Sequence, residues 1–228
     1  ERANAATFAH CYQAGDEAQN YVATLEVSAS DGEVYVFTLG ETNVPPLERV
    51  EETSSLIVTT NSDVVDAFDG EISLREAIFY AEADATLGNT ITFAPSLKGQ
   101  TITLTERQLE IKQGLKIDAS SLYNASTQTP GITVDANGLS RVFYLNAGIN
   151  EKPIELIGLR ITGGRTEEDG GGVYVNSGTT TITNCAINDN EAYSGGGVYG
   201  RQENALTFTN CVINGNEATK SGGGVWGL

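Results

Sequence analysis

A repeat with a period of 26 residues constrains the fold of this chain more than any other feature. Residues 182–192, ITNCAINDNEA, recur as residues 208–218, FTNCVINGNEA, and a shorter copy, LIGLRITGG, occupies residues 156–164. A fixed period of this size is typical of proteins that stack one structural unit on the next. We therefore expect equivalent apolar positions to meet in ladders, which are Leu156/Ile182/Phe208, Leu159/Cys185/Cys211 and Ile161/Ile187/Ile213.

The repeat favours short strands joined at corners. It has neither the apolar stripes of helical repeats nor the leucine spacing of leucine-rich repeats. The alternation of apolar residues changes phase between Asn184 and Cys185, which requires a bend in the chain. Asparagine tolerates the left-handed conformation of a tight bend, so Asn184 and Asn210 predict the same corner in neighbouring coils. Gly171 and Gly196 predict a second corner, where small residues allow close approach of the backbone.

We interpret residues 90–228 as a right-handed parallel β-helix, a single-stranded solenoid in an all-β protein. Roughly 138 residues at about 26 residues per coil give about five coils, each with three strands, and strands of successive coils stack about 4.8 Å apart. Short β-rich segments separated by Gly, Asn, Asp and Ser support this interpretation. These segments are residues 90–93, 101–104, 115–117, 132–134 and 142–145.

Residues 56–89 predict a cap at the N-terminal end of the solenoid. A β-rich segment at residues 56–60 precedes a capping box formed by Ser73 and Glu76. The helix that follows, expected to end near Gly88, carries its apolar residues on one face, namely Leu74, Ala77, Ile78 and Ala81. We expect this helix to cover the first coil and shield its edge strands, with Arg75 in a structural role.

Residues 1–47 predict a partial β-sandwich-like segment, and residues 48–55 predict a linker. Two alternating strands, residues 21–29 and 34–39, form a hairpin around a turn. A two-stranded hairpin is marginal on its own. Because the chain also contains no Met and stops within a repeat at Leu228, we expect it to be a piece of a longer protein.

Three parts of the sequence resemble known families. Residues 73–78, SLREAI, resemble the CSLREA motif with Ile72 in place of its cysteine, and residues 58–164 resemble large bacterial surface or secreted proteins with a pectin-lyase-like β-helix. The Gly-Gly-Gly-Val blocks resemble those of polymorphic outer-membrane proteins, and residues 8–46 resemble the end of a PKD-like, immunoglobulin-type β-sandwich. The resemblance implies export, either secreted or on the cell surface in association with an outer membrane. It does not imply one activity.

The charge of the chain argues against nucleic acid as a partner. The net charge is −17, from 30 acidic and 13 basic residues, and such a surface repels a phosphate backbone. No apolar run approaches the roughly 20 residues that span a bilayer, so we expect no transmembrane segment in this chain. His10 is the single histidine and no CxxC pair is present, which argues against structural zinc and a histidine-based triad.

One loop offers candidate catalytic residues. Glu167, Glu168 and Asp169, with Arg165 and Arg160 nearby, combine carboxylates with a base, as a polysaccharide lyase or glycoside hydrolase requires. The alternative is a solvated corner that precedes Gly170.

Candidate metal ligands and cysteines also have structural alternatives. Asp63, Asp66 and Asp69 offer oxygen ligands to calcium, although their spacing is not that of an EF-hand loop, and the alternative is a solvated turn before the helix. No other cofactor is expected. Cys185 and Cys211 predict a buried ladder of free thiols, and Cys11 has no visible partner.

We therefore expect an extracellular or cell-surface β-helical segment, structural or adhesin-like and without catalytic activity. Its partner would be a carbohydrate or a host or cell-surface protein. The alternative is a polysaccharide lyase or hydrolase, or a carbohydrate-binding module, on the pectin-lyase-like fold. An exposed groove that holds two or more carboxylates and a basic residue would favour the enzyme.

Overall fold

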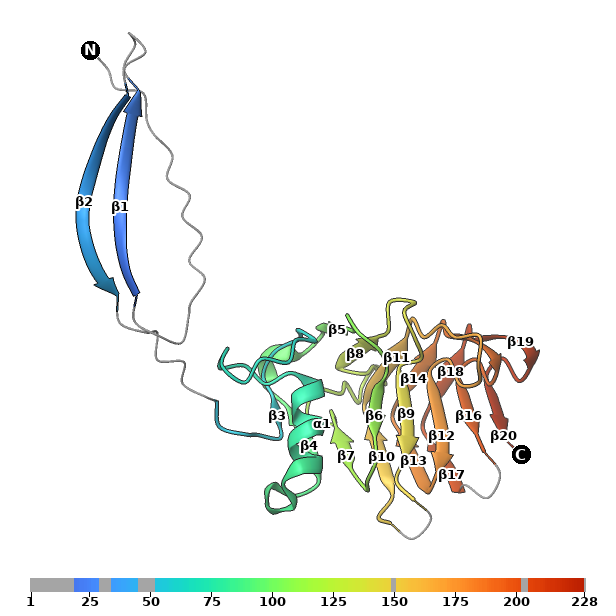
Figure 1. Cartoon of the computed structure of the whole chain (residues 1–228). Coiled ribbons are helices and arrows are strands. Elements are labelled where there is room, and N and C mark those ends of the chain that lie inside the picture. The colour runs from blue at the N-terminus through green and yellow to red at the C-terminus, as the bar shows by residue number, and fades with distance from the viewer. Residues whose placement is uncertain (1–18, 29–33, 45–51, 149–150, 202–204, 228) are drawn as a thin grey trace. The chain divides into compact units, whose positions relative to one another are not determined.

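The computed structural model describes residues 19–28, 34–44, 52–148, 151–201 and 205–227, with side chains from residue 52 onward. Residues 1–50 and 51–228 form two separate compact units. In the first unit β1 (Gln19–Ser28) pairs antiparallel with β2 (Val34–Val44), which confirms the predicted hairpin (Figure 1). The rest of the predicted β-sandwich-like segment, including His10 and Cys11, and most of the predicted linker lie outside the described residues.

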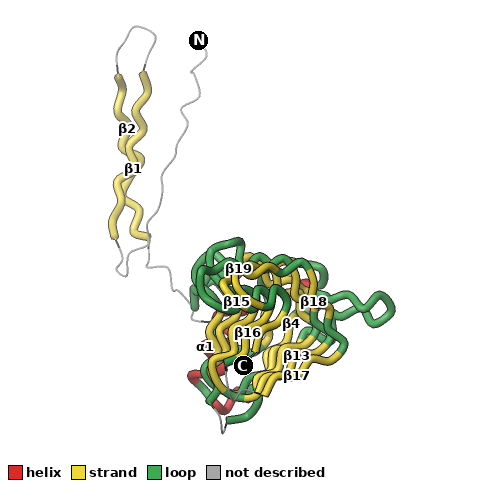
Figure 2. Tube along the Cα trace, turned by 90° about the vertical axis from the view of Figure 1, so that its right-hand side faces the viewer, coloured by secondary structure: helices red, strands yellow, loops and turns green. Residues whose placement is uncertain are grey.

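The second unit is a parallel β-helix, as the repeat predicted. Within its described residues three parallel sheets run along the stack, with six, five and five strands, and Figure 2, which looks along the stack, shows successive coils overlapping. The six-stranded sheet contains β3 (Ile57–Val58), β4 (Thr90–Phe93), β7 (Lys116–Asp118), β10 (Ile154–Ile157), β13 (Thr179–Thr183) and β17 (Ala205–Thr209).

The other two sheets supply one strand each per coil. The second contains β5 (Thr101–Thr103), β8 (Ile132–Asp135), β11 (Leu159–Thr162), β14 (Ala186–Asn188) and β18 (Val212–Asn214). The third contains β6 (Leu109–Ile111), β9 (Phe143–Asn146), β12 (Val173–Ser177), β16 (Val198–Gly200) and β20 (Val225–Gly227). At the corner between them, β15 (Glu191–Ser194) pairs with β19 (Glu217–Ser221).

Apolar ladders fill the inside of the coils. Ile161 pairs with Ile187, which pairs with Ile213, and the first two side chains are fully enclosed. A second ladder joins Leu156, Ile182 and Phe208. Both ladders have the predicted register, so equivalent repeat positions meet inside the solenoid.

The predicted corners have the expected backbone geometry. Asn184 and Asn210 have φ values of 55° and 51°, in the left-handed region that a tight bend requires. At the second corner a Cβ on Gly171 would lie 2.6 Å from the Gly196 carbonyl oxygen, and one on Gly196 would lie 2.1 Å from that of Glu217. Glycine is therefore required at this corner by close packing of successive coils.

A helix closes the N-terminal end. α1 (Leu74–Ala83) begins at the predicted capping box: the Ser73 hydroxyl accepts from the Glu76 amide, and Glu76 accepts from the Ser73 amide at 2.8 Å. The α-helix ends earlier than predicted, because the Asp84 side chain accepts from the Thr86 amide and starts a separate 3-10 turn that reaches Gly88. The apolar face of the helix is buried, namely Leu74, Ala77, Ile78 and Ala81.

The segment before α1 is tied to the first coil by a buried ion pair. Arg75 donates from Nε and Nη2 to the two carboxylate oxygens of Asp63 at 3.0 and 2.9 Å, and its Nη2 also donates to the Arg107 carbonyl. Asp63 further accepts from the Thr105 amide at 2.9 Å. Arg75 is therefore structural, as expected.

Candidate functional site

An aromatic ladder runs along the outer face of the third sheet. The strand register places Tyr144 beside Tyr174, Tyr174 beside Tyr199, and Tyr199 beside Trp226. Side chains alternate across a strand, and the neighbouring Phe143 is fully buried, so the tyrosines lie on the outer face. The stacking of coils thus converts one tyrosine per coil into a continuous row.

The three tyrosine rings stack on one another. The ring centroids of Tyr144 and Tyr174 are 5.3 Å apart, as are those of Tyr174 and Tyr199, and the planes are nearly parallel. Because the faces cover one another, the row presents ring edges and hydroxyls. Burial raises the pKa of the Tyr174 hydroxyl above its ordinary value, which extends to higher pH the range in which this hydroxyl can donate a hydrogen bond.

An open hollow of about 570 Å³ lies beside this row, and we call it the tyrosine groove. Its lining combines aromatic rings with two arginines, an amide and two carboxylates. The residues are Arg141, Tyr144, Glu168, Asp169, Tyr174, Asn176, Tyr193 and Arg201.

Arg141 fixes one wall of the tyrosine groove. The side chain is buried, donates from Nη2 to Glu168 at 2.7 Å and from Nε and Nη2 to the Asp169 carbonyl, and donates from Nη1 to Gln108. Its guanidinium carbon lies 5.2 Å from the centroid of the Tyr174 ring. One buried cation therefore holds the 166–170 loop against the aromatic row.

A row of polar side chains, formed by Arg201, Asn176 and Asn146, lies along the other wall of the tyrosine groove. Arg201 donates from Nη1 to the Asn176 side-chain oxygen at 2.8 Å, and Asn176 donates in turn to Asn146 at 2.9 Å. In the part of the chain that the structure describes, Arg201 has no carboxylate within ion-pair distance. Among the described side chains, its guanidinium thus donates to a neutral amide rather than to a carboxylate.

A larger open hollow of about 680 Å³ lies at the corner next to the tyrosine groove, and we call it the corner hollow. Tyr193 lines both hollows. Arg165 and Glu191, which are 3.2 Å apart, form an ion pair in the corner hollow. The remaining lining is Leu139, Ser140, Thr166, Glu167, Ala192 and Thr219.

The four predicted catalytic candidates all lie on these two hollows but are divided between them. Arg165 and Glu167 line the corner hollow, whereas Glu168 and Asp169 line the tyrosine groove. Glu168 is bound to Arg141, and one oxygen of Asp169, Oδ1, is enclosed without a hydrogen-bond partner among the described residues. Arg160 lies apart on β11, with Asp189 at 4.0 Å as its closest acidic neighbour.

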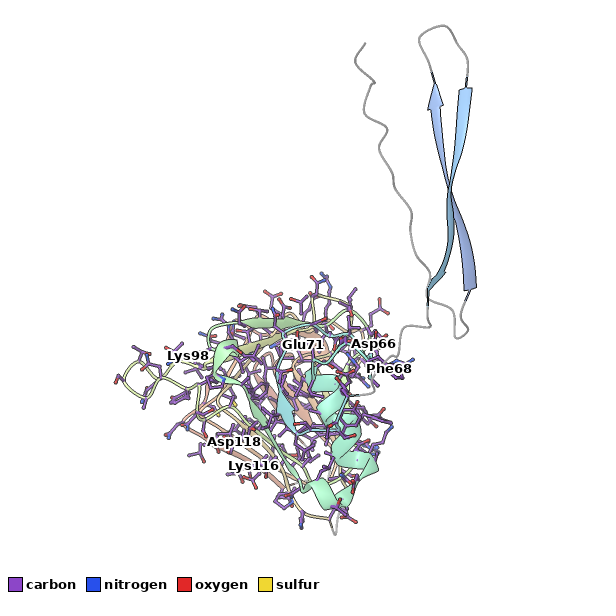
Figure 3. All side chains as sticks on the ribbon, turned by 90° about the vertical axis from the view of Figure 1, so that its left-hand side faces the viewer. Asp66, Phe68, Glu71, Lys98, Lys116 and Asp118 are labelled. Carbon is purple, nitrogen blue, oxygen red and sulfur yellow. The ribbon has the colours of Figure 1, made fainter. Side chains whose placement is uncertain are left out.

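The three predicted calcium ligands are not brought together. Asp63 is buried and occupied by Arg75 and the Thr105 amide, while Asp69 accepts from the Glu71 amide at 2.8 Å. Figure 3 labels Asp66, whose carboxylate accepts from the Phe68 amide at 3.1 Å. Among residues with described positions, no three acidic, cysteine or histidine side chains form a group that could hold a metal ion. The aspartates instead fix the turn that precedes α1.

The stacked cysteines are free thiols, as predicted. Cys185 is buried, Cys211 is partly exposed, and neither forms a disulfide. Burial raises the pKa of the Cys185 thiol from 9.0 to about 12. An uncharged thiol at this depth packs as a small apolar side chain.

The sequence analysis missed the tyrosine groove. Tyr174, Tyr199 and Trp226 each follow the valine of a Gly-Gly-Gly-Val block, and this shared position was the available signal. Arg141 and Arg201 carry no such signal, because their place depends on how loops of unequal length pack.

None of the described helices is long and apolar enough to cross a membrane. Comparison of the chain with protein-family models, with curated proteins and with solved structures finds no match.

Proposed function

We propose that the β-helix is an extracellular, non-catalytic binding segment of a larger protein and that the tyrosine groove holds a carbohydrate chain. The observation that carries the proposal is the row of stacked tyrosines beside Arg201 and Asn176. Sugars present many hydroxyls, which match a row of tyrosine hydroxyls flanked by side chains that donate and accept hydrogen bonds. The extracellular location rests on the resemblance of the SLREA region and the glycine blocks.

The rigid scaffold supports binding at this place. Each wall of the tyrosine groove is fixed to sheet or loop backbone through Arg141 or through the chain of Asn146, Asn176 and Arg201. Preorganised side chains lose little entropy when a ligand binds, so a shallow groove can still hold a flexible glycan.

A glycan array followed by calorimetry tests the proposal. Arg201→Ala removes a charged donor, and we expect at least about a tenfold loss of affinity for the glycan that binds. Arg160→Ala, which removes an exposed arginine from another sheet, is the matched control and should bind as the unchanged protein does. Equal losses in both variants, or no glycan bound by the folded protein, would contradict the proposal.

The enzyme remains a second candidate because the tyrosine groove contains two carboxylates and two arginines. Glycoside hydrolysis requires two carboxylates that flank one bond. Glu168 and Asp169 are consecutive residues, and Glu168 is held by Arg141. Release of new reducing or unsaturated ends from the bound polysaccharide, abolished by Asp169→Asn, would favour the enzyme over the binding segment.

A further inference from the structure

Tyr193 stands where the two hollows meet. It lines both of them, and each wall continues from one hollow into the other through consecutive residues. Ser140 and Glu167 line the corner hollow, while the next residues, Arg141 and Glu168, line the tyrosine groove. The two hollows therefore share their walls.

Tyr193 differs from the tyrosines of the ladder. It lies in β15 at the corner, its side chain is 45% exposed, and Lys220 Nζ lies 5.0 Å from the ring centroid. It stacks on none of the ladder tyrosines. An exposed ring of this kind offers its surface to the C–H groups of a sugar, which the mutually stacked rings cannot do.

The lining of the two hollows is close to electrically neutral, although the whole chain carries a net charge of −17. Arg165 pairs with Glu191 at 3.2 Å, and Arg141 pairs with Glu168 at 2.7 Å. The two carboxylates of the tyrosine groove, Glu168 and Asp169, are matched in number by its two arginines, Arg141 and Arg201. A charged ligand would therefore meet carboxylates and guanidinium groups side by side and would gain no net attraction from the lining.

We propose that the corner hollow and the tyrosine groove are subsites of one groove and that an uncharged linear polysaccharide crosses Tyr193 from one subsite to the other. The inference rests on the proposed function and specifies its ligand class. A chain that fills both subsites gains from the second without a second loss of translational freedom. Affinity should therefore rise steeply once an oligomer is long enough to pass Tyr193.

Calorimetry with oligomers of defined length tests this inference. The probes are uncharged β-1,4-linked glucose, mannose, xylose and N-acetylglucosamine oligomers of about two to six residues, with oligogalacturonate of equal lengths as the charged comparison. We expect the longest oligomers of one uncharged series to bind at least about tenfold more tightly than the shortest. Oligogalacturonate should bind more weakly than that series at every length.

Variants at the junction supply the controls. Tyr193→Ala should abolish the gain in affinity with oligomer length, whereas Tyr193→Phe, which keeps the ring, should retain that gain. Thermal melts confirm that both variants are folded, as an exposed position allows. Three outcomes would overturn the two-subsite inference alone. They are an affinity that does not depend on oligomer length, a gain in affinity with length that survives Tyr193→Ala, and tighter binding of oligogalacturonate than of the uncharged oligomers. No binding of any oligomer overturns the proposed function and this inference with it.

Discussion

Asn190 shows how a single polar side chain holds successive coils together. It is 1% exposed, its oxygen accepts from the Gly164 amide at 2.9 Å, and its Nδ2 lies 3.1 Å from the Ile161 carbonyl. The backbone N–H of Asn190 donates to the side-chain oxygen of Asn216, which is the equivalent residue of the next coil. The stacked amides satisfy backbone groups that the corner would otherwise leave buried without partners.

Asn190→Ala should lower the free energy of unfolding by roughly 2 kcal/mol or more, because the Gly164 amide and the Ile161 carbonyl lose their partner away from water. Urea denaturation measures the change. Asn214→Ala, at an exposed position of the last coil, is the control and should stay within about 0.5 kcal/mol of the unchanged protein. Equal stability of the two variants would refute the structural role of the buried amide.

The two cysteines that the structure describes, Cys185 and Cys211, should differ sharply in reactivity. Burial raises the pKa of Cys185 to about 12, so almost no thiolate forms near pH 8, where alkylating reagents act on thiolates. In the native protein, iodoacetamide should therefore label the partly exposed Cys211 well before Cys185, as mass spectrometry of peptides would show. In denaturant the two should react at similar rates, and early labelling of native Cys185 would contradict its burial.

The raised pKa of the Cys185 thiol also predicts that the protein loses stability at alkaline pH. The thiol pKa of Cys185 is higher in the folded chain than its ordinary value of 9.0, so the folded state holds its proton more tightly. This contribution is complete below about pH 9 and is lost as the pH rises toward 12. Cys185→Ala should remove this part of the pH dependence in denaturant titrations.

At the residue scale, the sequence predicts one corner of the coils but not a second corner that has similar backbone geometry. Asn184 and Asn210 are the same amino acid at the same repeat position, and asparagine has a known tolerance for positive φ. The corner at Gly163, Asp189 and Gly215 also has positive φ in three successive coils, from 58° to 67°. The residue at this position changes from Gly to Asp and back to Gly, so the sequence does not reveal that the three corners share a positive φ.

At the element scale, α1 depends on both its cap and its buried face. The capping box and the Arg75–Asp63 pair fix where the helix begins, and the apolar residues fix which side faces β3 and β4. Spacing and the Ser73–Glu76 pair predict the start and the buried face of the helix from the sequence, but not the Arg75–Asp63 pair, because these two residues lie 12 positions apart. The end of the helix could not be predicted, because the Asp84 turn competes locally with helix continuation.

Ile78→Asp should detach the cap. Ile78 is 5% exposed, so its replacement buries a carboxylate without a partner and should cost about 3 kcal/mol or more. We expect a lower melting temperature and stronger binding of a dye that reports exposed apolar surface. Phe79→Asp is the control, since the neighbouring side chain is 62% exposed. Unchanged melting and dye binding in the Ile78 variant would refute the role of the helix as a cap.

At the scale of the whole solenoid, the repeat period differs from one sheet to another. The inward ladders through Ile182 on the first sheet and Ile187 on the second keep the 26-residue spacing over the last coils. On the third sheet, the outer tyrosine row and the buried ladder of Phe143, Val173 and Val198 are both spaced by 30 residues and then by 25. Corner loops of unequal length absorb these differences, so the repeat predicts the ladders of the first two sheets, whereas the tyrosine groove emerges only from the stacked coils.

Stacking also predicts that the cost of a core substitution depends on where its coil lies. Each coil contacts only its neighbours, so a side chain between two coils has packing partners on both sides. Ile187, paired with Ile161 and Ile213, is fully buried, while Ile213 is partly exposed at the last described coil.

Ile187→Ala should therefore cost about 2–5 kcal/mol, and the chemically identical Ile213→Ala should cost less than half as much. Urea denaturation of both variants gives the comparison, because the ladder position is the same and only the number of neighbouring coils differs. An equal loss of unfolding free energy in the two variants would mean that each isoleucine stabilises the fold independently of its neighbours in the ladder. Contact between coils would then not determine the stability of this solenoid.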